Sequence, residues 1–234
     1  MTRPRVVSLV PSATETLFAL GVQPVGCTRF CDVADVPTVG GTKNVDVDGV
    51  VALAPDLVVV NDEENRRADA EELEARGLSL HSMSPRSVAD VGAAVCALAA
   101  AIGATAPAPF DAWEEWELRT RSLPRLSAFV PIWRRPWMSL ASDTYGSSLL
   151  AHVGITNIFD HADERYPEVA LADVAGRAPD AILLPSEPYV FAERHALELR
   201  ETIPDARTTF VDGRDLFWWG IRTPAAAARL QDVR

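Results

Sequence analysis

A short phrase occurs twice in this chain of 234 residues, and it constrains the fold more than any other feature. Ala54-Pro55-Asp56 precedes the apolar run Leu57–Val60, and Ala178-Pro179-Asp180 precedes the apolar run Ala181–Leu184. A repeat determines architecture before any local detail does. The sequence therefore predicts two copies of one structural plan.

Each copy has the pattern of an α/β lobe. A strand-like run opens each half, at Val6–Val10 and at Ala128–Ile132, and helix-like and strand-like segments then alternate. This alternation is typical of a parallel sheet, and continuous apolar strands suit a sheet that is covered on both faces. We predict an α/β fold of two lobes with mainly parallel sheets, an N-terminal lobe over 1–103 and a C-terminal lobe over 124–234.

Helix signals mark the beginning of the first lobe and the segment between the lobes. Ser12-Ala13-Thr14-Glu15 has the pattern of a capping box, which predicts a helix that begins there and ends at Gly21. In the segment 104–123, Phe110, Trp113 and Trp116 recur at roughly helical spacing before Pro124. We expect that segment to form a single helix that connects the lobes.

Charge and composition exclude several classes of function. The chain carries 33 Asp and Glu against 22 Lys and Arg, a net charge of −11, so no nucleic-acid partner is expected. No window approaches the ~18 to 20 uninterrupted apolar residues of a membrane span, so no membrane insertion is expected.

The N-terminal residues and the cysteines both predict a cytoplasmic protein. The apolar run Val6–Val10 is shorter than the ~7 to 15-residue core of a signal peptide. Cys27, Cys31 and Cys96 are odd in number and have no framework spacing, which favours reduced thiols. The spacing of Cys27 and Cys31 leaves metal binding open as an alternative.

The residues that follow each strand are the candidates for ligand contact, because ligands collect beyond the carboxyl ends of parallel strands. In the N-terminal lobe these candidates are Ser12, Thr14, Arg29, Phe30, Thr42, Lys43, Asn61 and Glu63. In the C-terminal lobe they are Trp133, Arg134, Trp137, Tyr166, Tyr189, Phe217, Trp218 and Trp219.

Several of these candidates also have a structural interpretation. Trp133 and Trp137 flank Pro136 and could simply pack that loop. If 217–219 is extended, side chains alternate, so at least one of its aromatic rings must face away from the lobe interior. The acidic run 62–64 also fits the first turn of a helix.

No catalytic or metal-binding motif accompanies these candidates. Gly40-Gly41-Thr42 lacks the remainder of a phosphate loop, and neither a Gly-x-Ser-x-Gly elbow nor a His-Glu-x-x-His motif occurs. The four histidines are scattered, and only His161 lies in an acidic, loop-like segment. We assign no catalytic residue and no metal ligand.

The segment Arg5–Gly21, which reads RVVSLVPSATETLFALG, resembles the opening of the cobalamin-binding type of periplasmic binding proteins, the helical-backbone metal receptors. The resemblance covers nearly the whole chain. It continues through Val25–Thr28, Cys31-Asp32, Val39–Asn44, Leu53–Val58, Trp133–Met138, Arg165–Val169 and Glu187–Tyr189. It implies the type III substrate-binding fold, in which two α/β lobes are joined by one long helix and hold a ligand in the cleft between them.

Three departures from this family bear on its transport role. The chain shows no export signal, and the helix expected over Pro107–Ser122 is shorter than usual. Arg66-Arg67 stands where an acidic transporter-docking residue is expected. These departures make a transporter partner doubtful.

The sequence thus predicts a non-enzymatic, cytoplasmic binding protein for a small-molecule metal chelate, cobalamin or another corrinoid. Loop tryptophans suit the wide apolar faces of a corrin ring, and Asn, Thr and Arg suit its rim of amides. One alternative is the substrate-binding component of an ABC-type cobalamin or metal-chelate uptake system. Another is an enzyme that remodels such a cofactor, with Asp62, Glu63 or Glu187 as acid or base.

Overall fold

The computed structural model describes residues 3–105 and 125–233, which divide into two compact units. Unit 1 holds 3–85, 89–105 and 219–222, and unit 2 holds 86–88, 125–218 and 223–233. The predicted connecting helix with Phe110, Trp113 and Trp116 lies outside the described residues, apart from positions 104 and 105. The predicted lobe boundaries and the predicted cleft therefore stay predictions.

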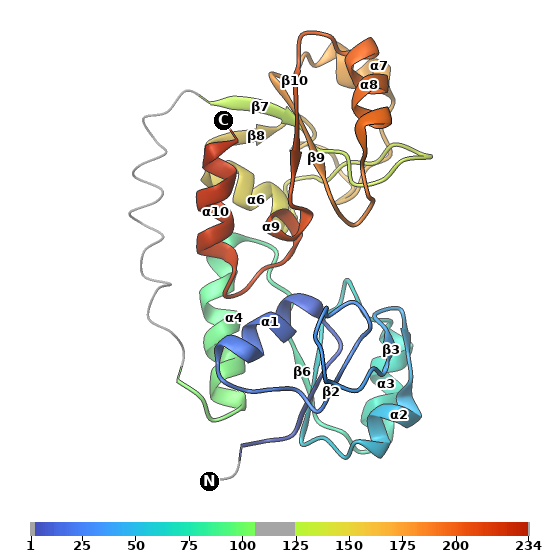
Figure 1. The fold of residues 1–234 in the computed structure, drawn as a ribbon, viewed down its shortest axis with the longest axis vertical. Coiled ribbons are helices and arrows are strands. Elements are labelled where there is room, and N and C mark those ends of the chain that lie inside the picture. The colour runs from blue at the N-terminus through green and yellow to red at the C-terminus, as the bar shows by residue number, and fades with distance from the viewer. Residues whose placement is uncertain (1–2, 106–124, 234) are drawn as a thin grey trace. The chain divides into compact units, whose positions relative to one another are not determined.

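Both units alternate helices and strands (Figure 1). The elements of unit 1 are β1 (Val6–Ser8), α1 (Pro11–Ala19), β2 (Gly26–Cys27), β3 (Gly40–Gly41), β4 (Asn44–Val45), α2 (Val47–Ala52), β5 (Leu57–Val60), α3 (Arg67–Ala75), β6 (Leu80–Ser82) and α4 (Val88–Ala101), whose first residue is grouped with unit 2. The elements of unit 2 are β7 (Leu126–Phe129), α6 (Tyr145–His152), β8 (Ile155–Asn157), α7 (Leu171–Gly176), β9 (Ala181–Pro185), α8 (Glu193–Thr202), β10 (Arg207–Val211), α9 (Gly213–Phe217) and α10 (Thr223–Asp232).

The main sheets of the two units have the same topology. Unit 1 has the strand order β2-β1-β5-β6 and unit 2 has the order β8-β7-β9-β10, with neighbouring strands parallel throughout. In each sheet, the second strand of the sequence lies on one side of the first, and the third lies on the other. The predicted α/β fold with two parallel sheets is confirmed.

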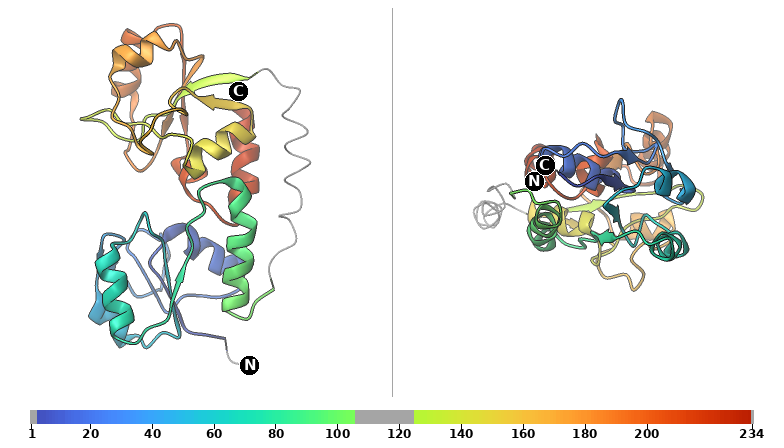
Figure 2. Two further views of the ribbon diagram at one scale, coloured as in Figure 1. Left: turned by 180° about the vertical axis from the view of Figure 1, so that it is seen from behind. Right: turned by 90° about the horizontal axis from the view of Figure 1, so that it is seen from below.

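Helices cover both faces of each sheet, as the two side views show (Figures 1 and 2). In unit 1, α2 and α3 lie on one face and α1 and α4 on the other; in unit 2, α7 and α8 lie opposite α6 and α10. The core of unit 1 includes Val7, Val58 and Leu73, and that of unit 2 includes Ile182 and Leu199. Because both faces are covered, the central strands are continuously apolar.

The repeated Ala-Pro-Asp phrase has the same structural role in both units. Ala54 and Ala178, which follow α2 and α7, adopt the left-handed conformation with φ of 44° and 45°. Asp56 Oδ2 then accepts a hydrogen bond from the backbone N–H of Arg5 at 2.7 Å. Asp180 Oδ2 accepts from the backbone N–H and the hydroxyl of Ser127 at 2.7 and 2.6 Å. Each aspartate thereby ties the beginning of its own strand to that of the neighbouring strand.

The Asp180 contact makes the stability of unit 2 depend on pH. Hydrogen bonds from the Ser127 hydroxyl and backbone N–H lower the pKa of Asp180. A carboxylate with a lowered folded-state pKa stabilises the fold above its unfolded pKa, and this contribution is lost as the pH falls through the folded value. We expect Asp180→Asn to lower the unfolding free energy by about 1 kcal/mol at neutral pH, since solvent screens this exposed pair.

Chemical denaturation at pH 7 and again well below pH ~4, the usual Asp range, measures this difference. The gap between wild type and Asp180→Asn should close in acid, whereas Asp205→Asn, at another exposed acid of unit 2, should have little effect. A deficit of the same size at both pH values would contradict the account.

Two helix beginnings differ from the prediction. Helix α1 begins at Pro11 after Val10, and no side chain caps it, so the predicted capping box is wrong. The proline supplies the φ angle of the first helical position and thereby sets an earlier beginning. The predicted end is confirmed, since Gly21 follows with φ of 74°. Helix α3 begins at Arg67, so the acidic run 62–64 is not its first turn.

Candidate functional site

The loops at the carboxyl ends of the central strands carry the candidate site in each unit. In each sheet the chain connects the first strand to a neighbour on one side and then crosses to a neighbour on the other side. Ligands of such sheets bind in the crevice at the carboxyl ends of the strands, where this change of direction occurs. In unit 1 these loops follow β1, β2 and β5; in unit 2 they follow β7, β8 and β9.

Two asparagines shape the loop that follows β5. Asn61 is buried; its Oδ1 accepts from the backbone N–H groups of Glu63 and Glu64 at 2.8 and 2.9 Å, and its Nδ2 donates to Met83 O at 2.7 Å. Asn65 Nδ2 donates to the carbonyls of Leu9 and Thr42. Asn61, predicted to contact ligand, thus has its side chain engaged in holding the loop.

The polar residues of α1 are buried. Ser12 and Thr14 are each 1% exposed. Thr14 Oγ1 contacts Val10 O at 3.0 Å and Cys31 Sγ at 3.2 Å, so this hydroxyl is used inside unit 1. Ser12 Oγ has no hydrogen-bond partner among the described residues. Of these two residues, Ser12 is therefore the one whose hydroxyl can still form a hydrogen bond.

The remaining candidates of unit 1 form its exposed edge. The guanidinium of Arg29 lies over the ring of Phe30, 4.8 Å from its centroid, and Phe30 is 50% exposed. Lys43 lies in the turn between β3 and β4, and its Nζ donates to the carbonyl of Glu63. Thr42 is half-buried beside it. This edge presents an aromatic ring and two cationic side chains.

Aromatic residues gather in unit 2. The ring of Trp133 meets the ring of Tyr189 edge to face at 5.4 Å, and Tyr189 in turn contacts Phe191 and His195. Trp133 remains 44% exposed. The set Trp133, Tyr189, Phe191 and His195 is called the aromatic cluster below. Its exposed member is the indole of Trp133, which packs on Tyr189, and Tyr189 packs on the two other rings.

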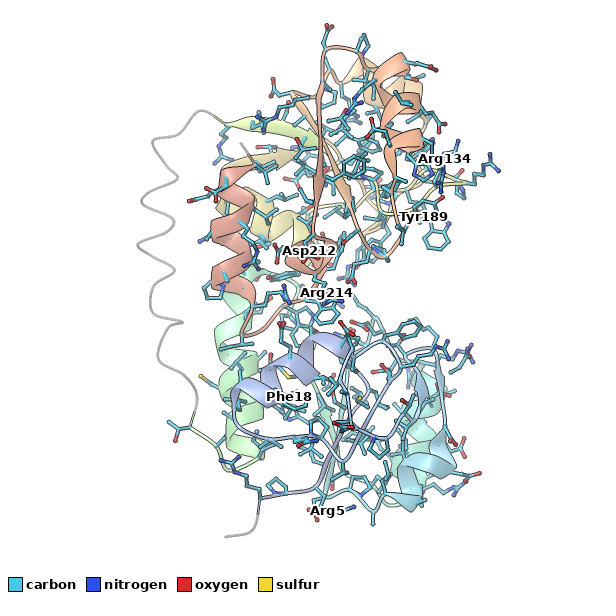
Figure 3. The ribbon with its side chains drawn as sticks, viewed as in Figure 1. Arg5, Phe18, Arg134, Tyr189, Asp212 and Arg214 are labelled. Carbon is cyan, nitrogen blue, oxygen red and sulfur yellow. The ribbon has the colours of Figure 1, made fainter. Side chains whose placement is uncertain are left out.

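Arg134 is held at the edge of this cluster. Its guanidinium donates to both carboxylate oxygens of Glu198 at 2.9 and 2.7 Å and lies 5.3 Å from the ring centroid of Trp137. Figure 3 shows Arg134 and Tyr189 on the same side of unit 2. Such a bidentate pair fixes the orientation of the guanidinium, which positions the neighbouring loop.

His195 determines how Tyr189 can hydrogen-bond. The backbone N–H of Ala192 donates to His195 Nδ1 at 2.9 Å, so a neutral imidazole carries its proton on Nε2. Burial, and then the charges of Arg194 and Arg134, lower the pKa of His195, which keeps the ring neutral. Nε2 lies 3.4 Å from the Tyr189 hydroxyl and can donate to it. The hydroxyl proton of Tyr189 is then available to another acceptor.

The other predicted aromatics differ in role. Trp137 stacks on Phe191 with an interplanar angle of 2°, so it packs its loop. Tyr166 is 37% exposed and has Arg165 over its ring. The segment 217–219 is not extended throughout, because Phe217 ends α9.

The two tryptophans after α9 are both engaged within the fold. Trp218 Nε1 donates to Glu187 Oε1 at 2.5 Å, and Arg214 lies over its ring. Trp219 is only 5% exposed and is grouped with unit 1. Both tryptophans follow α9 outside any helix or strand, as loop residues do, but Trp219 is buried and Trp218 is half-buried, and their predicted ligand contact stays a prediction.

Sequence reasoning did not identify His195, Phe191 or Glu198 as parts of the site. His195 and Glu198 lie one turn apart on α8, where the i, i+3 spacing was the only available signal, and it does not indicate which loop they face. Among 3–105 and 125–233, no three His, Cys, Asp or Glu side chains gather as a metal site. Within the same residues, no helix has the length and apolar character needed to cross a bilayer.

Comparisons with known proteins agree with this architecture. The model of the family described as periplasmic binding protein matches residues 6–196. The vitamin B12-binding protein of Vibrio vulnificus strain CMCP6 is 23% identical over 98% of this chain and 88% of its own length.

Solved structures share the fold at low identity. The periplasmic vitamin B12-binding protein of Vibrio cholerae has a TM-score of 0.82 at 18% identity, covering 98% of this chain and 96% of that one. A periplasmic heme-binding protein from Pseudomonas aeruginosa has a TM-score of 0.81 at 20% identity, covering 99% and 92%. The predicted resemblance to cobalamin-binding proteins of the periplasmic binding class is confirmed.

These comparisons overturn the predicted location. The matching family and both solved structures are described as periplasmic, so the prediction of a cytoplasmic protein is wrong. That prediction relied on the first residues of the chain and on the cysteine count, and neither reports the compartment in which a protein of this fold works.

Proposed function

Because this chain belongs to the periplasmic binding protein family, we propose that it is the substrate-binding component of an uptake system for a corrinoid or a similar metal chelate. The prediction that it is a binding protein and not an enzyme is confirmed by its relatives. The ligand class and the transporter partner are the parts that we propose.

The aromatic cluster is the observation that carries this proposal. Trp133 leaves 44% of its surface open while Tyr189 supports its edge. A large flat chelate exposes apolar faces that gain most from contact with a rigid aromatic ring, through burial and aromatic geometry. The Tyr189 hydroxyl adds a hydrogen-bond donor for a polar group at the rim.

The exposed edge of unit 1 supplies complementary polar groups. Arg29, Thr42 and Lys43 can donate to the carbonyl oxygens of a corrin's amide side chains, and Phe30 offers a second apolar surface. We propose that these residues contact the ligand, together with Ser12, whose buried hydroxyl lacks a partner among the described residues.

Cobalamin is the chelate that we favour, and heme is the second candidate. The relative described above is named for vitamin B12, whereas a protein of the same fold is named for heme. Heme carries two carboxylates, and a chain with a net charge of −11 repels them at long range. The amide rim of a corrinoid is not subject to this repulsion.

Parallel titrations with cobalamin and hemin, followed by tryptophan fluorescence and visible absorbance, test the ligand. We expect saturable binding of cobalamin with a lower Kd than that of hemin. Tighter binding of hemin would transfer the proposal to a porphyrin. Binding of neither at ~100 μM, about −5.5 kcal/mol, would reject a chelate ligand.

Truncation of Trp133 tests the aromatic cluster. Loss of burial at about 25 cal/mol per Å² together with ~0.5 to 1.5 kcal/mol of aromatic geometry predicts that Trp133→Ala weakens cobalamin binding by about 30- to 150-fold. Phe210→Ala is the matched control, because Phe210 is 45% exposed on strand β10 of the same unit. Equal affinities for the two variants in the titration would rule out a role for Trp133.

The partner that we propose is a membrane permease complex. The doubt about such a partner depended partly on the expected cytoplasmic location, which the comparisons overturn. Arg66 immediately precedes α3, and its guanidinium donates to Asn44 Oδ1, which gives this arginine a contact within unit 1. Co-purification of the tagged chain with a permease from membranes of its native source would support the proposal, and recovery of the chain alone would count against it.

A further inference from the structure

Two cysteines flank the exposed loop of unit 1. Cys27 ends β2 and is 2% exposed, and Cys31 lies four residues later and is 5% exposed. The backbone N–H of Cys31 donates to Thr28 O at 3.1 Å and closes a turn, so both side chains enter one small apolar cluster with Val36. The three residues between them include Arg29 and Phe30, which we propose as ligand contacts.

Hydroxyl groups surround the sulfur of Cys31. Thr14 Oγ1 lies 3.2 Å from Cys31 Sγ, and Thr28 Oγ1 lies 3.3 Å from it. Hydrogen bonds from Cys27, and then from the two threonines, outweigh burial and lower the pKa of Cys31 below its usual value. The pKa of Cys27 is raised by the same pairing and by burial. Cys31 is therefore the cysteine of the pair whose thiolate form is favoured.

We propose that Cys27 and Cys31 are a redox-active pair that closes to an intrachain disulfide by exchange with a small-molecule or protein disulfide. The thiolate of Cys31 attacks one sulfur of the oxidant, whose S–S bond breaks and releases the first thiolate. Cys27 then loses its proton to solvent and attacks Cys31 Sγ, which releases the second thiolate. The oxidant gains two electrons and its two released thiolates take up protons from solvent, while the protein gives up two electrons and the protons of its two thiols.

Closure changes the contacts of the intervening loop. A disulfide sulfur is a weaker acceptor for the hydroxyls of Thr14 and Thr28 than a thiolate is. The backbone N–H of Arg29 remains bonded to Gly40 O at 2.9 Å, so the loop becomes held at a further point. Disulfides persist outside the cytoplasm, which fits the periplasmic family of this chain.

Exchange with glutathione disulfide tests the pair without any ligand. The exposed Cys96 is first replaced in a Cys96→Ser background, which leaves only the buried pair. After incubation, alkylation in denaturant and peptide mapping by mass spectrometry, we expect a peptide that has lost two hydrogen atoms, with Cys27 and Cys31 both protected from alkylation. Two alkylated cysteines, under conditions that fully modify Cys96 in the wild type, would overturn the proposal.

The order of attack has its own test. Cys27→Ser in the same background should trap one glutathione on Cys31, because the resolving thiol is missing. Thr14→Val keeps both cysteines and should slow closure, since it removes a hydroxyl beside the thiolate. Circular dichroism checks that each variant folds. Accumulation of glutathione on Cys27, or closure at the wild-type rate in Thr14→Val, would contradict the assigned roles.

Discussion

Replacing Trp219 by alanine should lower the free energy of unfolding by about 3 to 5 kcal/mol, the range for removal of a buried aromatic side chain. Trp219 is 5% exposed. Its neighbour Gly220 comes so close to α1 that an added Cβ would lie 2.3 Å from Thr16 Oγ1, and Ile221 N donates to that hydroxyl. Arg222 donates to both carboxylate oxygens of Glu15. These contacts hold residues 220–222 against α1. The structure around position 219 therefore cannot easily move to fill the cavity that the missing indole would leave.

Trp133→Ala is the matched control for this prediction. The substitution is the same, but Trp133 is 44% exposed, so its stability loss should stay below about 1 kcal/mol while its ligand affinity falls. Denaturant titration at one pH measures both variants. Equal losses of stability would contradict the assignment of Trp219 to packing and Trp133 to binding.

Replacing Gly213 by alanine should lower the free energy of unfolding by about 2 to 4 kcal/mol and disturb the loop that carries Tyr189. A Cβ on Gly213 would lie 2.5 Å from the backbone nitrogen of Glu187 and 2.6 Å from its carbonyl oxygen. Backbone atoms cannot rotate away from a clash as the end of a flexible side chain can. Either α9 or the loop that contains Glu187 must therefore shift. Figure 3 marks the flanking residues Asp212 and Arg214.

Gly176→Ala provides the control for Gly213→Ala. Gly176 lies in α7 of the same unit, and a Cβ added there would meet no described atom within 4 Å beyond its own helix backbone and chain neighbours. Alanine at this position should therefore be neutral or stabilise by up to about 1 kcal/mol. Thermal and denaturant unfolding measure both variants, and cobalamin titration measures the effect on the site. A Gly213→Ala protein as stable as Gly176→Ala would disprove the close backbone approach.

The architecture was predictable because it rests on local patterns that occur twice. Apolar runs of strand length mark β5 and β9, and the Ala-Pro-Asp phrase before each one ends a helix and bonds to the neighbouring strand. Both signals lie within a few residues of the structure that they produce. The strand order of each sheet then follows from the usual preferences of parallel α/β units.

The candidate site was less predictable because tertiary contacts decide which side chains remain available. Asn61 and Thr14 follow the right strands, yet their polar groups bond to the backbone and to Cys31. Trp219 looked like a loop residue, and burial removes it from the surface. Tyr189 depends on His195 from α8, a partner six residues away whose orientation no periodicity reveals.

Gel filtration of this protein with excess cobalamin tests the central claim most directly. If the chain binds a corrinoid, the visible absorbance of the corrin ring should elute with the protein peak, and the Trp133→Ala protein should carry much less of it than the Phe210→Ala protein. A protein peak that remains colourless after incubation with cobalamin, and again after incubation with hemin, would contradict the proposed metal-chelate function.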